Sequence, residues 1–458
     1  MNFNVVVLAA GRGKRMRSKT PKILHEALGM PMLQHVINAV KPLNPAKTVV
    51  VIGNGAESVK QRMAVEGHLS FVVQRQLLGT GDALSVARKE LKKGAILVLN
   101  GDCPLITTKT LRTLIQKHKR SRNALSFLVF RDSSQAGYGR ILRDENGWVA
   151  GIVEDKHATP EQKAKFQELN GGVYILEAEV LKHLESIKRN RTSGEYYLTD
   201  IIGIAARNRK KVEAYLCSPE EIRGVNNREE LFEVADILRK RIVKKWMSRG
   251  VTFINPDASF VSPMAHIGQD TIIYPNTYLE GATKIGDNCI IFPGTRINDS
   301  VIGNDVTIKD NTLIEQSRIG SGSSIGPFAH LRPHTVTGRG VKIGNFVETK
   351  KSTLGDGTKA SHLSYIGDAV ISRNVNIGAG TITCNYDGKN KFKTVVESGV
   401  FIGSDSQLVA PVRIGKGAYV AAGSTVTKDV PAGSLAITRV KQQNLTGWVK
   451  KKKSRVKS

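Results

Sequence analysis

Cysteine is scarce in this chain of 458 residues. The four cysteines are widely separated and form no Cys-x-x-Cys pair; they are Cys103, Cys217, Cys289 and Cys384. Scattered cysteines of this kind argue against a structural zinc site and suit a reducing compartment. The length predicts two or three folded units, and a hydrophobic fraction of 40% is enough to give them cores.

Long apolar runs are also absent. No stretch of about 18 uncharged apolar residues occurs, so we expect no membrane span. The chain begins without basic residues before its first apolar stretch, Val5 to Leu8, and this stretch is more typical of a buried strand than of a signal peptide. We therefore expect a cytoplasmic location.

Acidic residues are outnumbered, because 40 Asp and Glu face 68 Lys and Arg and leave a net charge of +28. Composition alone leaves nucleic-acid binding and a preference for anionic small molecules open. The basic residues are spread along the chain and are not interleaved with aromatic residues, so we expect a solvated surface and no nucleic acid. The densest cluster, Lys450 to Lys453 with Arg455 and Lys457, predicts a disordered terminal tail.

What the second half of the chain does contain is an aliphatic residue at every sixth position, with short slips. These residues are Val261, Ile267, Ile273, Leu279, Ile285, Ile291 and Ile297, then Ile302, Ile308 and Ile314, then Ile319, Ile325 and Leu331, and finally Ile402, Leu408, Ile414, Val420 and Val426. A helix repeats near 3.6 residues and a strand near 2, so this period indicates a three-sided coil with one inward residue a side. It predicts a left-handed parallel β-helix from about residue 251 to 437. The period fails between Cys384 and Val400, which predicts an outward loop.

The first half alternates apolar runs with helical patterns, which predicts an α/β domain with a mostly parallel, Rossmann-like sheet. The expected strands are Val5 to Leu8, Thr48 to Ile52, Phe71 to Val73, Ala95 to Leu99, Leu125 to Phe130 and Gly172 to Leu176. The predicted domain covers residues 1–226. A helical stripe then predicts a linker helix over 227–250, and the β-helix domain with its basic tail takes 251–458.

Two strand ends of the first domain carry polar motifs. Val5 to Leu8 leads into Ala9-Ala10-Gly11-Arg12-Gly13, and Ala95 to Leu99 leads into Asn100-Gly101-Asp102. Ligands of such sheets bind beyond the carboxyl ends of the strands. Glycines let a backbone approach phosphate oxygens, and a carboxylate facing a polyphosphate usually acts through Mg²⁺. A lone Gly-x-Gly is equally compatible with a structural turn, and Asp102 with a turn residue.

The off-pattern residues of the β-helix carry a second candidate site. His362 interrupts a repeat where a small or aliphatic residue would pack, and the cations Arg332, Lys350 and Lys391 suit a sugar phosphate. A histidine removes a proton from an amine near neutral pH, as acyl transfer to an amino sugar requires. A lone histidine is more often structural, and a β-helix can serve only as a trimerisation stalk.

The motifs of the first domain resemble those of the sugar-nucleotide pyrophosphorylases. They are Leu8-Ala9-Ala10-Gly11-x-Gly13, Pro21-Lys22, Gln74, Leu78-Gly79-Thr80-Gly81, Gly101-Asp102, Tyr138-Gly139-Arg140-Ile141, Gly151-Ile152-Val153-Glu154, Asn170-Gly171, Glu195 to Asp200, and Gly224-Val225-Asn226-Asn227. With Gly378 to Gly388 and the β-helix, nearly the whole chain resembles the enzymes that combine glucosamine-1-phosphate acetyltransferase and N-acetylglucosamine-1-phosphate uridyltransferase activities.

The resemblance implies synthesis of UDP-N-acetylglucosamine, the precursor of peptidoglycan and lipopolysaccharide. N-acetylglucosamine-1-phosphate attacks the α-phosphorus of UTP and pyrophosphate leaves, a step that needs positioning and charge neutralisation more than a protein nucleophile. Implied contacts of these substrates are Leu8, Ala9, Ala10, Gly11, Lys22, Gln74, Gly79, Thr80, Asn100, Gly101, Asp102, Gly139, Glu154, Asn170 and Asn226. Asp102 and Asn226 are the implied Mg²⁺ ligands. The chain has Lys14 where the family commonly has Thr.

For the second domain the resemblance implies His362 as general base for acetyl transfer from acetyl-CoA to glucosamine-1-phosphate. Implied contacts of glucosamine-1-phosphate are Arg332, Lys350, Tyr365, Asn376 and Lys391. Implied contacts of acetyl-CoA are Ala379, Asn385, Tyr386, Ser404, Ala422 and Arg439. The family places this site between subunits of a homotrimer.

Three other functions remain open from the sequence. The chain could transfer a nucleotidyl group to another sugar phosphate and use the prism as a stalk, although a stalk needs neither His362 nor the loop at Asn385. It could be a non-enzymatic scaffold in nucleotide exchange, against which Lys22 and Asp102 argue. Nucleic-acid binding would require a recognised module, and the sequence has none.

Overall fold

The structure, a computed structural model, describes residues 2–64, 67–91, 93–132 and 137–455 and divides the chain into two compact units, Met1–Leu238 and Arg239–Ser458. The division falls within helix α7 (Arg228–Met247), which confirms the helix expected here. Val234 and Leu238 of α7 join an apolar cluster of the first unit, whereas Val243 and Trp246 belong to the core of the second. Among the described residues, no helix has the length and apolar character needed to cross a membrane.

The first unit is built on a mostly parallel sheet with the strand order β11-β7-β10-β6-β1-β4-β5. Its strands are β1 (Phe3–Ala9), β4 (Lys47–Ile52), β5 (Leu69–Val73), β6 (Ala95–Asn100), β7 (Leu125–Phe130), β10 (Leu169–Leu176) and β11 (Val212–Leu216). Strand β10 is antiparallel to β6 and β7, while β1 is parallel to both of its neighbours. The six expected strands are therefore confirmed.

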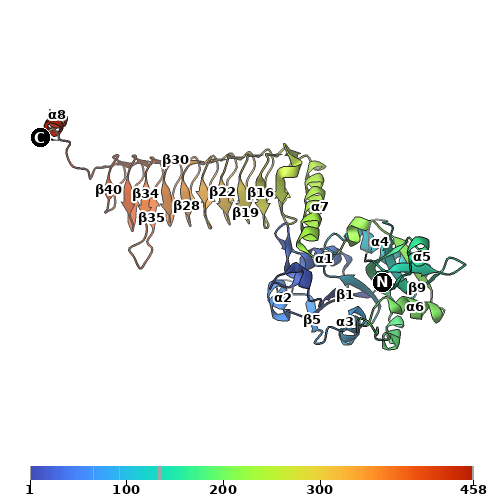
Figure 1. The fold of residues 1–458 in the computed structure, drawn as a ribbon. Helices are drawn as coiled ribbons and strands as arrows, with labels where there is room; N and C mark the ends of the chain where they lie inside the picture. Colours follow the sequence, from blue (N-terminus) through green and yellow to red (C-terminus); the bar gives the residue numbers. More distant parts are fainter. Residues whose placement is uncertain (1, 65–66, 92, 133–136, 456–458) are drawn as a thin grey trace. The chain divides into compact units, whose positions relative to one another are not determined.

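Helices cover both faces of this sheet. Successive residues of β1 alternate between two apolar clusters, since Val6 lies in one and Val5 and Val7 in the other, as the two-residue period of a strand dictates. The first cluster includes residues of α3 (Thr80–Ala87) and α6 (Asp200–Arg207). The second includes residues of α1 (Met32–Val40), α2 (Ala56–Met63) and α4 (Thr108–Ser121). The unit is a three-layer α/β fold (Figure 1).

Five described strands of the first unit were not expected. Two of them, β2 (Glu26–Ala27) and β3 (Met30–Pro31), form a separate antiparallel pair. Strands β8 (Arg140–Arg143) and β9 (Val149–Val153) form an antiparallel hairpin that joins the main sheet only where Arg140 pairs with Leu169. Strand β11 is an edge strand with only one fully buried residue, Val212. Strands β8, β9 and β11 are short and only partly buried. A further helix, α5 (Pro160–Lys165), follows this hairpin.

The second unit is the predicted left-handed parallel β-helix. Within the described residues it contains three parallel sheets of 11, 10 and 9 strands, running from β12 (Thr252–Phe253) to β41 (Leu435–Ala436). Figure 1 shows its coils stacked on one another. Every aliphatic residue of the predicted ladder exposes 3% or less of its surface, and these residues form one continuous core.

The ladder also continues where the sequence pattern was interrupted. Between Leu331 and Ile402 the inward positions include Thr337, Thr349 and Thr383 in place of aliphatic residues. Their hydroxyl groups are bonded inside the coil; for example, the hydroxyl of Thr383 donates to the Gly367 carbonyl at 3.0 Å and accepts from its N–H at 2.7 Å. Hydrogen bonds offset the free-energy cost of burying these hydroxyls, so threonine is accepted at inward positions of the core. The six-residue period of aliphatic residues is therefore interrupted in the sequence although the coil continues.

The expected loop leaves the β-helix between β34 (Ile382–Cys384) and β35 (Thr394–Val396), as Figure 1 shows. Tyr386 and Lys391 face each other across it in an isolated antiparallel bridge. At its tip a carboxylate oxygen of Asp387 accepts from the backbone N–H groups of Lys389 and Asn390, at 2.8 and 2.6 Å. The loop is thus an ordered hairpin, and the predicted interruption is confirmed.

The basic tail corrects the expectation of disorder. Trp448–Arg455 forms a helix, α8, and the ammonium of Lys452 lies 5.1 Å from the centre of the Trp448 ring. The segment lacks Gly and Pro and is rich in lysine, a good helix former, while residues four apart face each other on a helix. Lys457 of the predicted cluster lies outside the described residues.

Candidate functional sites in the two units

The two polar strand ends of the first unit lie side by side. Strands β1 and β6 are parallel neighbours in which Leu8 pairs with Asn100, and the N–H of Gly101 donates to the Leu8 carbonyl at 2.9 Å. The segments Ala9–Gly11 and Gly101–Asp102 therefore leave the same edge of the sheet. Sequence reasoning expected this edge to carry the site.

The ammonium of Lys22 joins the two predicted metal ligands. It forms an ion pair with Asp102 and donates to the side-chain oxygen of Asn226 at 3.2 Å. A backbone hydrogen bond of 3.0 Å from the N–H of Val225 to the Asp102 carbonyl places Asn226 beside Asp102, although the two are far apart in the sequence. The three predicted residues thus form one cluster.

Glu230 of α7 fixes the orientation of Asn226. One carboxylate oxygen of Glu230 accepts from the backbone N–H and the side-chain amide of Asn226, at 2.6 and 3.1 Å. The other accepts from the amide of Asn227, whose oxygen in turn accepts from the Glu230 N–H at 2.8 Å. Because the amide nitrogen of Asn226 faces Glu230, its oxygen is directed to Lys22.

The segment Ala9-Ala10-Gly11-Arg12-Gly13 at the end of β1, called the glycine loop below, approaches Lys22 closely. Gly13 has φ of +58°, and a Cβ at this position would lie 2.6 Å from the Cβ of Lys22. A side chain here would be strained by the left-handed backbone and would collide with Lys22, so the loop requires glycine. Lys14 follows at the start of a short 3-10 helix, Lys14–Met16, and its side chain is exposed.

The start of α3 lies against the segment Tyr196–Leu198 through Gly79 and Thr80, and Gln74 holds it from the other side of the chain turn by hydrogen bonds to Gly79 and Asp82. The side-chain amide of Gln74 donates to the Gly79 carbonyl at 3.0 Å and to Asp82 at 2.6 Å. The hydroxyl of Thr80 accepts from the Leu198 N–H at 3.0 Å. These bonds hold the start of α3 in place.

The predicted sugar contacts also come together. The N–H of Asn170 donates to the Gly139 carbonyl at 2.8 Å, and a Cβ at Gly139 would lie 3.7 Å from a carboxylate oxygen of Glu154. The other carboxylate oxygen of Glu154 accepts from the Thr199 hydroxyl at 2.7 Å. Asp200 follows Thr199 in the sequence. Its burial, and after that the charge of Glu154, raises the pKa of its carboxyl group.

No activated thiol serves the cluster around Asp102. Cys103 is buried, and burial, followed by the neighbouring charge of Asp102, raises the pKa of its thiol. A thiol must lose its proton to become a strong nucleophile. This environment therefore keeps Cys103 in its unreactive form, which agrees with chemistry that needs no covalent intermediate.

In the second unit, His362 lies above Asn345 on the next coil. They are the last residues of β30 (Lys359–His362) and β27 (Lys342–Asn345), they pair in register, and Nδ1 of His362 lies 3.0 Å from the side-chain oxygen of Asn345. His362 is exposed, and the inward position of its coil is filled by the buried Ala360. The expectation that His362 interrupts a repeat is therefore wrong, because its side chain lies outside the core. Asn345 was not predicted.

His362 shares a column with three of the predicted acetyl-CoA contacts. Five residues occupy the position two places after successive inward residues of the 11-stranded sheet: Asn345, His362, Ala379, Ser404 and Ala422. Neighbouring parallel strands lie about 4.8 Å apart, so Ser404 is about 10 Å along the column from His362. Arg439 donates to the Ala422 carbonyl, which adds a cation at its far end.

The predicted cations form a second cluster. A guanidinium nitrogen of Arg332 lies 2.7 Å from Glu348 of β28 (Glu348–Lys350). The charge of Lys391, and after it that of Arg332, lowers the pKa of Lys350. Glu348 pairs with Tyr365 on the next coil. The loop hairpin therefore brings Lys391 near Lys350, where the two like charges repel each other.

The remaining predicted contacts have separate surroundings. The amide of Asn385 donates to Asp368 at 2.5 Å and is buried at the base of the loop, while Tyr386 is exposed above it. Asn376 lies on β33 (Asn376–Ile377), where it pairs with Lys359 and Phe401.

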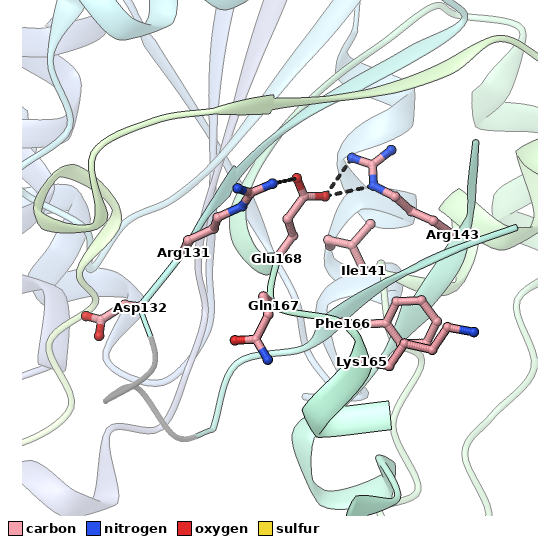
Figure 2. A pocket seen from close by; sticks show the side chains of 8 residues that line it. All are labelled: Arg131, Asp132, Ile141, Arg143, Lys165, Phe166, Gln167 and Glu168. Carbon is pink, nitrogen blue, oxygen red and sulfur yellow. Dashed lines mark hydrogen bonds and ion pairs between the residues drawn. The ribbon is translucent and has the colours of Figure 1, made fainter. Parts of the chain in front are cut away.

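A pocket in the first unit contains none of the predicted residues. Figure 2 shows its centre, where Glu168 lies between two arginines, 3.3 Å from Arg131 and 2.6 Å from Arg143. Glu168 therefore holds both guanidinium groups by ion pairs.

Sequence reasoning missed Glu230, Thr199 and Asn345. The pattern Asn227-Arg-Glu-Glu230 was a detectable signal, because an N-cap residue followed three places later by Glu is typical of a helix start. Thr199 lay inside a recognised motif. For Asn345 the signal was its separation of 17 residues from His362, the length of one coil at this point.

Family models match both units. A MobA-like NTP transferase domain matches residues 5–194, a GMPPB C-terminal domain matches 255–345, and a six-repeat bacterial transferase hexapeptide model matches 393–428. A solved structure of a UDP-glucose pyrophosphorylase complexed with UDP-glucose matches with a TM-score of 0.44 at 18% identity, over 53% of this chain and 100% of that chain.

Full-length relatives are more similar. A curated protein of Thermodesulfovibrio yellowstonii, named bifunctional protein GlmU, is 50% identical over 98% of this chain and 100% of its own length. A protein of the same name from Clostridium beijerinckii is 46% identical over 98% of both chains. With identity at this level across both units, the chain belongs to the family of bifunctional GlmU proteins.

Proposed function

We propose that the chain makes UDP-N-acetylglucosamine in two steps, one in each unit. The second unit transfers acetyl from acetyl-CoA to glucosamine-1-phosphate, and the first transfers uridyl from UTP to the N-acetylglucosamine-1-phosphate so formed, releasing pyrophosphate. The observation that carries this proposal is the presence of two chemically distinct sites: Lys22 with Asp102 and Asn226, and His362 with a cluster of cations.

The residues of the first site fit Mg²⁺. Asp102 and Asn226 direct two oxygens at the single cationic group of Lys22, which marks a position suited to positive charge. Mg²⁺ prefers oxygen ligands and is usually held by one or two protein groups, with phosphates and waters completing its shell. Among the described residues no group of three or more His, Cys, Asp and Glu gathers as a metal site, so a site relying on substrate oxygens is the one that fits. Bound there, Mg²⁺ would neutralise charge on the triphosphate.

In uridyl transfer, this chain's residues bind and orient. The glycine loop admits the triphosphate close to its backbone, and Lys22 supplies a cation beside it. Glu154 and Asn170 hold the sugar, whose phosphate oxygen attacks the α-phosphorus of UTP as the bond to pyrophosphate breaks. Holding both reactants in line accounts for a large part of catalysis in such displacements.

In acetyl transfer, His362 acts as general base. The amine nitrogen of glucosamine-1-phosphate attacks the thioester carbon, and its proton passes to the imidazole. The imidazolium then returns this proton to the sulfur as the bond from carbon to sulfur breaks, so coenzyme A leaves as its thiol. Arg332, Lys350 and Lys391 bind the sugar phosphate, since the like charges that lower the pKa of Lys350 favour an anion there. Coenzyme A lies along the column of Ala379, Ser404 and Ala422, with Asn385, Tyr386 and Arg439 beside it.

The assembly and location follow the same resemblance. We propose a homotrimer in which neighbouring β-helices complete the acetyl site, consistent with the hexapeptide repeats. The substrates are small molecules, and a cytoplasmic location stays a prediction from the sequence.

The experiment that tests the function assays each step separately. Asp102→Ala should lower uridyl transfer at least 10²-fold, the order expected when charge stabilisation is removed, and leave acetyl transfer unchanged. His362→Ala should do the reverse, by about 10²- to 10⁴-fold. Pyrophosphate release and free coenzyme A thiol are the two readouts.

Matched controls are the exposed Glu145→Ala in the first unit and His334→Asn in the second, where Asn tolerates the positive φ of His334. Both should retain both activities. A wild-type chain that releases pyrophosphate but no thiol would support the alternative in which the β-helix is only a stalk.

A second prediction concerns Glu230, which holds Asn226 in place without facing the metal position. Glu230→Ala should weaken divalent-cation binding by about 10-fold, the lower range for groups that orient metal ligands. Electron paramagnetic resonance of free Mn²⁺, which shares the oxygen preference of Mg²⁺, measures this directly. Glu229→Ala, on the neighbouring exposed residue, is the control. Equal affinity of the Glu230→Ala chain and the wild type would contradict the role of Glu230.

A third prediction concerns the hairpin loop. Lys391→Ala should raise the KM for glucosamine-1-phosphate several-fold, because a charge-assisted hydrogen bond to phosphate is lost, and should leave the KM for acetyl-CoA unchanged. Initial rates at varied sugar phosphate give the value. Lys389→Ala in the same loop controls for loop charge, and an equal effect of the two substitutions would show that the loop acts only through its overall charge.

A further inference from the structure

Asn345 and His362 form a pair that the backbone does not require. The backbone ladder between their coils is completed by the N–H of Leu363, which donates to the Asn345 carbonyl at 3.0 Å. The side chains make a separate contact of 3.0 Å above this ladder. The amide of Asn345 can therefore be replaced while the coil keeps its own hydrogen bonds.

The chemistry of this contact fixes which ring nitrogen is free. An amide oxygen only accepts hydrogen bonds, so Nδ1 of His362 carries the hydrogen that it donates to Asn345. In the neutral imidazole the lone pair then lies on Nε2. Nε2 points away from Asn345, and it is the nitrogen that can take a proton from a substrate.

We propose that Asn345 is a positioning residue for acetyl transfer: it holds the imidazole of His362 in the tautomer and orientation in which Nε2 is the base. This inference rests on the proposed acetyltransferase function. The bond from nitrogen to the acetyl carbon forms and the bond from carbon to sulfur breaks. The amine proton goes to Nε2 and from there to the leaving sulfur. Asn345 touches neither substrate, and its whole effect passes through the ring of His362.

The pair also fits the column in which it lies. Ala379, on the coil after His362, has no side-chain group able to hydrogen-bond the ring, so Asn345 is the neighbour within the column that can. Adjacent residues of the column, such as Asn345 and His362, lie on neighbouring strands about 4.8 Å apart. At this separation the side-chain amide of Asn345 can hydrogen-bond the imidazole of His362 directly.

Two substitutions test the proposal in the full-length chain. Asn345→Leu keeps the size and removes the acceptor, and it should lower the kcat of acetyl transfer by about 10²-fold, a value within the range that a general base contributes, with the KM of both substrates unchanged. Asn345→Asp keeps an acceptor oxygen and carries no donor. Assayed at a pH above the ordinary titration range of imidazole, it should restore most of the rate.

The controls separate this inference from the proposed function. Lys342→Leu, on an exposed residue of the same strand, should leave kcat unchanged, and uridyl transfer measured in every variant should stay at the wild-type rate. A wild-type chain without acetyl transfer, or an active His362→Ala chain, would overturn the function itself. With those two results as expected, full activity of Asn345→Leu would overturn the role of Asn345. Equal loss in Asn345→Leu and Asn345→Asp would show that the amide acts as a donor, which also contradicts the proposal.

Discussion

Parallel pairing of strands is the constraint on which both candidate sites depend. In a parallel pair, residues at equivalent positions lie about 4.8 Å apart and point the same way. In the first unit this puts the ends of β1 and β6 together, so that the glycine loop and Asp102 leave one edge of the sheet. In the second it stacks His362 on Asn345 and continues through Ala379 to Ser404.

The two sites differ in how far their cationic side chains are paired with carboxylates. In the first, the cation of Lys22 is balanced by Asp102, the carboxylate that we propose as a ligand of Mg²⁺. In the second, Arg332 has Glu348 as a partner, whereas Lys350 and Lys391 face each other and depress the pKa of Lys350. In the proposed function, an anionic sugar phosphate relieves this repulsion.

The sequence predicted the scaffold better than the contacts within it. The aliphatic rungs, the strand ends and the hairpin loop follow from local periodicity in the sequence. Ile308 is one regular position of the ladder, and Cys384 marks the point where the period stops and the loop begins. The threonine rungs could not, because Thr383 fits the core only through hydrogen bonds made by the fold. The pairing of Asn226 with Asp102 depends on one long-range backbone bond. For Asn345, the length of each coil had to be known before its neighbour could be named.

The central claim is that two independent sites, one in each unit, act in sequence. Its most direct test supplies glucosamine-1-phosphate, acetyl-CoA, UTP and Mg²⁺ to the Asp102→Ala and His362→Ala chains, separately and mixed, and measures UDP-N-acetylglucosamine. The account predicts almost no product from either chain alone and restored synthesis from the mixture, since the acetylated intermediate passes from one chain to the other through solution. A mixture as inactive as its components, with both chains folded, would contradict it.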